Sequence, residues 1–90
     1  MGPEAKLRTE VIVWAKDRGC MVGRFYELGF PDRVFVLPNG KVAFIEFKAK
    51  GKKPTIMQCR KLNNLSDLGH HAAWFDSAEC AISYLKGLMI

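Results

Sequence analysis

The stretch FPDRVFVLPNGKVAFIEFKAK, residues 30–50, decides the fold of this chain. Apolar and polar residues alternate on both sides of Pro38-Asn39-Gly40. This alternation is typical of half-buried strands, and a Pro-Asn-Gly segment between two such runs favours a tight turn. The stretch therefore predicts a β-hairpin whose strands cover residues 33–37 and 41–49.

The hairpin carries two carboxylates, Asp32 and Glu46, among its apolar residues. Opposed residues of a hairpin share a face, so the length of the loop decides whether the two carboxylates meet. A two-residue loop would place them on opposite faces, whereas a three-residue loop pairs Leu37 with Lys41 and sets Asp32 against Glu46. Proline first and glycine last suit a loop of three, so we predict that Pro38-Asn39-Gly40 forms the whole loop.

Two carboxylates in such close contact repel each other, and a hard divalent cation with oxygen ligands removes the repulsion. Mg²⁺ typically binds one or two protein carboxylates together with water and phosphate. Lys48 lies two residues after Glu46 and on the same face, where an ammonium can stabilise charge on a phosphate or position an attacking water. A second interpretation is that Asp32, Glu46 and Lys48 are edge charges that keep the sheet soluble.

A helix and a strand are predicted before the hairpin. Pro3 suits a first helical turn and Gly19 a helix end. Residues 20–28 are predicted to form a strand, with Gly23 as a β-bulge. Glu4 lies on the inward face of the helix and Glu10 outside it, so Glu4 is the better third carboxylate, although it could instead complement the helix dipole.

A helix, a strand and a final helix are predicted after the hairpin. The expected elements are a helix over 55–68, a strand over 70–75 and a last helix that begins at a capping box formed by Asp76 and Glu79. A strand that is reached through a helix favours a parallel crossover. The chain is therefore expected to be α/β, in the order α-β-β-β-α-β-α, with a mixed four-stranded sheet flanked by helices.

The 90 residues predict one domain over 1–90. No apolar run approaches the roughly 18 residues that a membrane span needs, and no leader opens the chain. We expect a soluble protein of a reducing cytoplasm with no membrane partner. Its odd set of separated cysteines, Cys20, Cys59 and Cys80, is read as buried free thiols.

The formal net charge is +5, and the segment from Lys48 to Lys61 contains six basic residues and no acid. A segment of this kind suits a polyanion such as nucleic acid, and a solvated basic face is the alternative interpretation. The predicted nucleic-acid contacts are Lys50, Lys52, Lys53, Arg60 and Lys61, with Arg24 and Tyr26 before the hairpin as further candidates.

Pro31-Asp32 and Glu46-Phe47-Lys48 resemble the PD-(D/E)XK nuclease superfamily. With Glu4, the Gly29-Phe30-Pro31-Asp32 turn and the downstream Gln58, the pattern more closely resembles the VRR-NUC family over about residues 4 to 76. The resemblance implies a restriction-endonuclease-like core and a Mg²⁺- or Mn²⁺-dependent DNA endonuclease. It implies catalytic roles for Asp32, Glu46, Lys48 and Gln58, and metal binding by Glu4, Asp32, Glu46 and the backbone carbonyl of Phe47.

Small members of the family resemble phage or bacterial enzymes that act as homodimers on branched DNA such as four-way (Holliday) junctions. A homodimer and a branched DNA substrate are therefore expected for this chain. The alternatives are a nuclease for flaps or for DNA in general, a non-catalytic nucleic-acid-binding module, and a structural dimerisation domain. Gln58 also has a local interpretation, because Thr55 and Gln58 have the spacing of a capping box.

Overall fold

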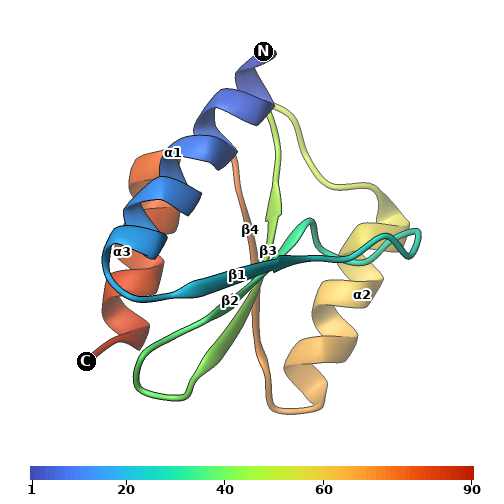
Figure 1. The fold of residues 1–90 in the computed structure, drawn as a ribbon. Coiled ribbons are helices and arrows are strands. Elements are labelled where there is room, and N and C mark those ends of the chain that lie inside the picture. Colours follow the sequence, from blue (N-terminus) through green and yellow to red (C-terminus); the bar gives the residue numbers. More distant parts are fainter.

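A computed structural model describes residues 1–90 as three helices and a four-stranded mixed sheet in the order α-β-β-β-α-β-α (Figure 1). The order and the α/β class agree with the sequence prediction. The elements are α1 (Pro3–Asp17), β1 (Met21–Arg24), β2 (Arg33–Val36), β3 (Val42–Phe47), α2 (Ile56–Asp67), β4 (His71–Phe75) and α3 (Ala78–Leu88).

The sheet has the strand order β1-β2-β3-β4. The first three strands form an antiparallel meander, and β4 joins β3 in parallel after the chain has crossed over through α2. The parallel crossover was predicted because β4 is separated from β3 by a helix. The first strand is shorter than predicted, and it pairs with β2 without a bulge at Gly23, which lies directly opposite Val34.

The hydrophobic core lies between the sheet and the pair α1 and α3. Ala43, Ile45 and Phe47 alternate along β3 and are fully buried. They pack with Val11 of α1 and Leu85 of α3 in one cluster. Figure 1 shows α1 and α3 on one side of the sheet and α2 on the other. The side chains of β3 between these core residues, including that of Glu46, therefore face α2.

Two local predictions are wrong. Helix α3 is capped by Ser77, whose side chain accepts a hydrogen bond from the backbone of Cys80, and not by Asp76. The Asp76 carboxylate instead accepts a hydrogen bond from the backbone N–H of Gly51. This contact with a distant residue explains why Asp76 does not cap α3. All three cysteines are free, but only Cys20 is buried.

No helix combines the length and the apolarity that crossing a membrane requires.

Candidate active site

The β2–β3 hairpin brings Asp32 and Glu46 together. Leu37 N donates to Lys41 O at 2.8 Å and closes a three-residue loop whose last residue, Gly40, has φ +87°. The ladder pairs Arg33 with Ile45, and one further step along this register places Asp32 opposite Glu46. The predicted loop and register are confirmed.

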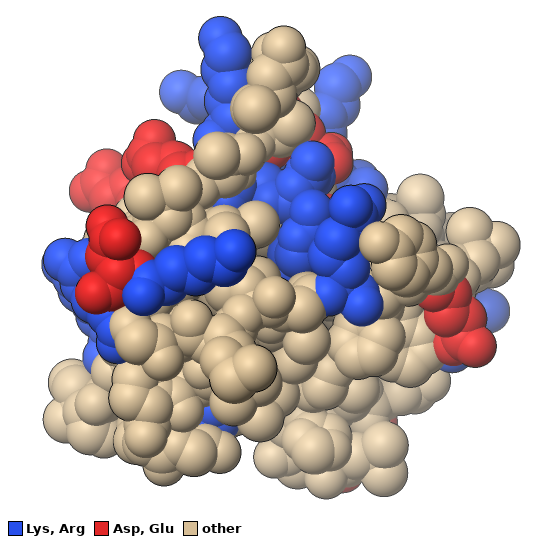
Figure 2. Space-filling model, viewed as in Figure 1, with Lys and Arg blue, Asp and Glu red and all other residues tan.

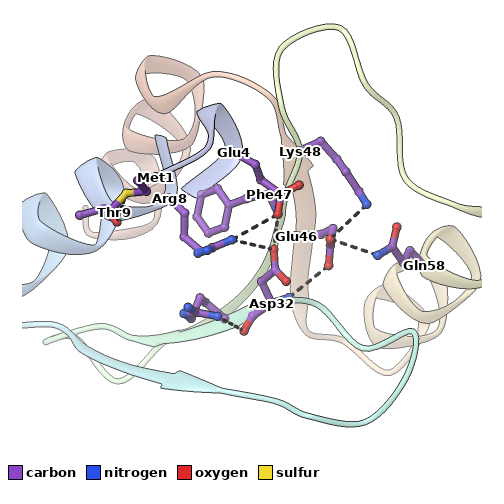
Figure 3. A network of polar contacts seen from close by, with 10 residues as sticks. Met1, Glu4, Arg8, Thr9, Asp32, Glu46, Phe47, Lys48 and Gln58 are labelled. Carbon is purple, nitrogen blue, oxygen red and sulfur yellow. Dashed lines mark hydrogen bonds and ion pairs between the residues drawn. The ribbon is translucent and has the colours of Figure 1, made fainter. Parts of the chain in front are cut away.

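Two hydrogen bonds between side chain and backbone fix the two carboxylates. Asp32 N donates to Glu46 Oε1 at 3.2 Å, and Phe47 N donates to Asp32 Oδ2 at 3.2 Å (Figure 3). Each carboxylate therefore accepts a hydrogen bond from the opposite strand. This reciprocal arrangement orients both side chains before any ligand is present.

Glu46 is the one charged residue of the buried set, with only 2% of its surface exposed. Burial, followed by repulsion from Asp32, raises the pKa of Glu46 from its ordinary value of 4.5 to about 7, against the opposing effect of Lys48. A carboxyl group with this pKa is close to half protonated at neutral pH. The site therefore favours any cation that can replace the proton.

Lys48 and Gln58 converge on the same oxygen of Glu46 from two different elements (Figure 3). Lys48 Nζ lies 3.6 Å from Glu46 Oε2, and Gln58 Nε2 donates to that oxygen at 3.2 Å. Gln58 also completes the cap of α2, because its Oε1 accepts from Thr55 N while Thr55 Oγ1 accepts from Gln58 N. The two interpretations of Gln58 are thus compatible, since one end of the amide caps the helix and the other contacts Glu46.

A second group of charges approaches Asp32 from α1. Arg8 Nη1 lies 3.2 Å from Glu4 Oε2 and 3.9 Å from Asp32 Oδ2, so this guanidinium stands between the two acids (Figure 3). Glu4 is half-buried as its place on the helical wheel predicted, whereas Glu10 is exposed. Sequence reasoning missed Arg8, although its spacing of four residues from Glu4 was a sign that the two would pair.

The donor set fits a hard divalent cation at Asp32 and Glu46. The two carboxylates lie on opposed positions of the hairpin, and burial followed by repulsion from Asp32 raises the pKa of Glu46, so a bound cation would favour its charged form. No group of three or more His, Cys, Asp or Glu side chains is arranged to hold a metal. Glu4, which is bonded to Arg8, and the Phe47 carbonyl therefore stay predictions as metal ligands.

The predicted nucleic-acid contacts fall into two groups along the chain. Lys50, Lys52 and Lys53 are exposed on the connection from β3 to α2, and Arg60 is exposed on α2. The Lys61 side chain already has partners within the chain, because its ammonium lies 4.7 Å from the centre of the Phe30 ring and 3.9 Å from the Glu27 carboxylate. The second group is Arg24 and Tyr26, whose side chains stack at 5.1 Å beyond the end of β1.

Comparison with known proteins finds a sequence relative and several solved structures of similar fold, two of which are described below. No protein-family model matches the chain. "Putative nuclease p44" of Acyrthosiphon pisum secondary endosymbiont phage 1 is 49% identical over 51 residues, which are 57% of this chain. The match covers 55% of the phage protein, so this chain spans about half of that protein's length.

The structural relatives match over nearly the whole chain. A solved VRR_NUC domain superposes with a TM-score of 0.85 at 22% identity, covering 96% of this chain and 97% of its own. A solved VRR_NUC domain protein superposes with a TM-score of 0.77 at 17% identity, covering 97% of this chain and 88% of its own. This chain therefore has the fold of the VRR-NUC domain, as its motifs predicted.

Proposed function

We propose that this chain is a metal-dependent endonuclease that hydrolyses phosphodiester bonds in DNA. The observation that carries the proposal is the opposition of Asp32 and Glu46 on one hairpin, with Lys48 and Gln58 both directed at Glu46. The VRR-NUC fold and the likeness to the phage protein named a nuclease support it.

Each residue of the site has a role in this proposal. Asp32 and Glu46 would hold Mg²⁺ or Mn²⁺, which supplies charge stabilisation at the scissile phosphate and a lowered pKa for an attacking water. The Lys48 ammonium would position that water or stabilise charge that develops on the phosphate. Gln58 would keep Glu46 oriented and ionised, because its amide N–H favours the charged form of the carboxyl.

The basic residues around the site would contact the DNA backbone. Lys50, Lys52 and Lys53 are exposed before α2 and Arg60 is exposed on it, and Lys61, Arg24 and Tyr26 are further candidates. Contacts of lysine and arginine with phosphates position DNA without reading its sequence. We therefore propose that the enzyme recognises DNA structure, with branched DNA such as a four-way junction as the preferred substrate.

A homodimer is part of the proposal. A two-fold pair would present two equivalent sites for two symmetric cuts in a branched DNA. Light scattering on the purified protein tests this directly. A mass of one chain under the conditions of cleavage would refute the dimer without affecting the chemistry.

The nuclease proposal is tested by incubating the protein with Mn²⁺ and four DNAs: linear duplex, single strand, flap and four-way junction. We expect fastest cleavage of the junction, and a loss of about 100-fold or more in Lys48→Ala. Lys41→Ala removes an equal charge at the far end of the hairpin and should leave cleavage unchanged. Equal cleavage by the Lys48→Ala variant would refute the mechanism, and equal cleavage of all four DNAs would refute the selectivity.

A further inference from the structure

Two arginines lie directly opposite each other on neighbouring strands. The register of β1 and β2 pairs Arg24 with Arg33, so their side chains leave the same face of the sheet. Like charges in this position destabilise a sheet. Neither arginine forms an ion pair with an acidic side chain of this chain.

A third guanidinium joins them at Asp32. Arg33 Nη1 donates to the backbone oxygen of Asp32 at 3.0 Å, and Arg8 Nη1 lies 3.9 Å from the carboxylate of the same residue. The three side chains come from α1, β1 and β2, and they meet at the edge of the candidate active site.

This arginine cluster, Arg8, Arg24 and Arg33, is open to solvent on one side. Arg24 is exposed, and its guanidinium lies over the ring of Tyr26, which is 83% exposed. Figure 2 shows basic side chains gathered into a continuous group near the middle of the visible face. An anion can therefore reach the cluster from solvent.

We propose that the arginine cluster is a phosphate-binding site for a DNA strand whose neighbouring phosphate occupies the Asp32–Glu46 site. Guanidinium groups bind phosphate oxygens through paired hydrogen bonds, and a bound phosphate removes the repulsion between Arg24 and Arg33. This proposal rests on the proposed function, because the phosphate that the arginine cluster binds is part of the nuclease substrate. By binding it, the cluster selects which phosphodiester of the strand lies against Asp32.

The ligand phosphate is either an internal phosphodiester or a terminal 5′-phosphate, and three DNAs separate the two. They are a closed dumbbell duplex with no ends, a linear duplex with 5′-phosphates and the same duplex with 5′-hydroxyls. Binding is measured by fluorescence anisotropy in EDTA over a series of salt concentrations. The variant is Arg24→Gln/Arg33→Gln, and the charge-matched control is Arg18→Gln/Lys41→Gln, whose residues directly follow α1 and the hairpin loop.

We expect the double variant to bind about tenfold or more weakly than the control, because the neutral amide of glutamine lacks the charge and the paired donors of a guanidinium. The slope of log affinity against log salt should fall by about 1 to 2, because each phosphate that is no longer neutralised lowers the slope by about one. Equal weakening on all three DNAs assigns an internal phosphodiester, and weakening confined to the 5′-phosphorylated duplex assigns a terminal phosphate. A thermal melt no lower than that of the control excludes misfolding.

The inference is overturned if the double variant binds all three DNAs with the affinity and salt slope of the control, or if the wild-type chain binds none of them. Its failure is distinguishable from failure of the proposed function. Binding in EDTA requires no chemistry, so a protein whose binding is weakened in the double variant but that never cleaves DNA would refute the nuclease and retain the phosphate site.

Discussion

Gln58 and Glu46 are joined by a hydrogen bond of 3.2 Å, and the same amide group of Gln58 caps α2 through Thr55 N at 2.9 Å. The start of α2 is thereby tied to the buried carboxylate of β3. Because Gln58 Oε1 is used by the cap, its Nε2 is directed toward Glu46, so the orientation of one amide serves both the helix and the site.

Two substitutions separate these roles. Gln58→Glu keeps an oxygen for the cap, but it removes the donor to Glu46 and adds a like charge beside it. We expect unchanged helix stability and a marked loss of cleavage. Thr55→Ala removes the cap oxygen and should lower the free energy of unfolding by about 1 kcal/mol with little effect on cleavage.

Chemical denaturation and the junction-cleavage assay measure the two effects on the same proteins. If both variants lose stability and activity together, Gln58 acts only through the fold of α2. If Gln58→Glu cleaves as well as the wild type, the contact with Glu46 has no part in the reaction.

The raised pKa of Glu46 predicts how stability varies with pH. Between pH 4.5, the ordinary pKa, and about 7, the folded chain retains a proton that the unfolded chain has released. The free energy of unfolding therefore falls as pH rises through this window, by at most about 3 kcal/mol from this group. Glu46→Gln should remove this part of the pH dependence, whereas Glu10→Gln, on the exposed face of α1, should not.

The stabilisation of the folded chain by bound Mn²⁺ should increase as the pH rises, which is opposite to the effect of the Glu46 proton. A divalent cation at Asp32 and Glu46 favours the ionised form, so the rise in melting temperature that Mn²⁺ produces should grow from pH 5 to pH 8. Melting curves with and without Mn²⁺ check this for the wild type and both variants. A Mn²⁺ effect that is equal in Glu46→Gln and wild type would place the ion elsewhere.

The hairpin could be predicted from sequence because its determinants are local. The alternation of residues around Pro38-Asn39-Gly40 and the left-handed conformation that Gly40 supplies are both properties of a short segment. The opposition of Asp32 and Glu46 then follows from counting, since the loop length fixes the register.

Arg8 and Arg33 could not be assigned in this way because their roles depend on tertiary packing. Arg8 meets Asp32 only because α1 packs on one face of the sheet, and Arg33 is significant only because β1 places Arg24 opposite it. The cap of α3 shows the same limit, since Asp76 is engaged by the distant backbone of Gly51. A sequence pattern within one segment does not indicate which distant residues will contact that segment.

Relief of the repulsion between Arg24 and Arg33 should stabilise the protein without DNA. Arg24→Gln removes one charge of the cross-strand pair, and we expect the free energy of unfolding to rise by about 0.2–1 kcal/mol. The effect should shrink at high salt because these side chains are partly exposed. Denaturation at low and high salt measures it, with Arg18→Gln as the matched control; a lower stability of Arg24→Gln would show that the pair does not repel.

The pairing of Leu37 with Lys41 should control whether Asp32 and Glu46 meet. Deletion of Asn39 leaves Pro38 and Gly40 between Leu37 and Lys41, so these two residues can still pair and Asp32 stays opposite Glu46. We expect the deletion variant to be less stable, because Pro38 cannot adopt the positive φ that a two-residue loop requires at its first position, and to keep cleavage. Gly40→Ala keeps the loop length but places a side chain at φ +87°, so it should cost about 1–2 kcal/mol of stability and keep measurable activity. A deletion variant that folds but no longer cleaves would contradict the expectation that the pairing of Leu37 with Lys41 is sufficient to bring the two carboxylates together.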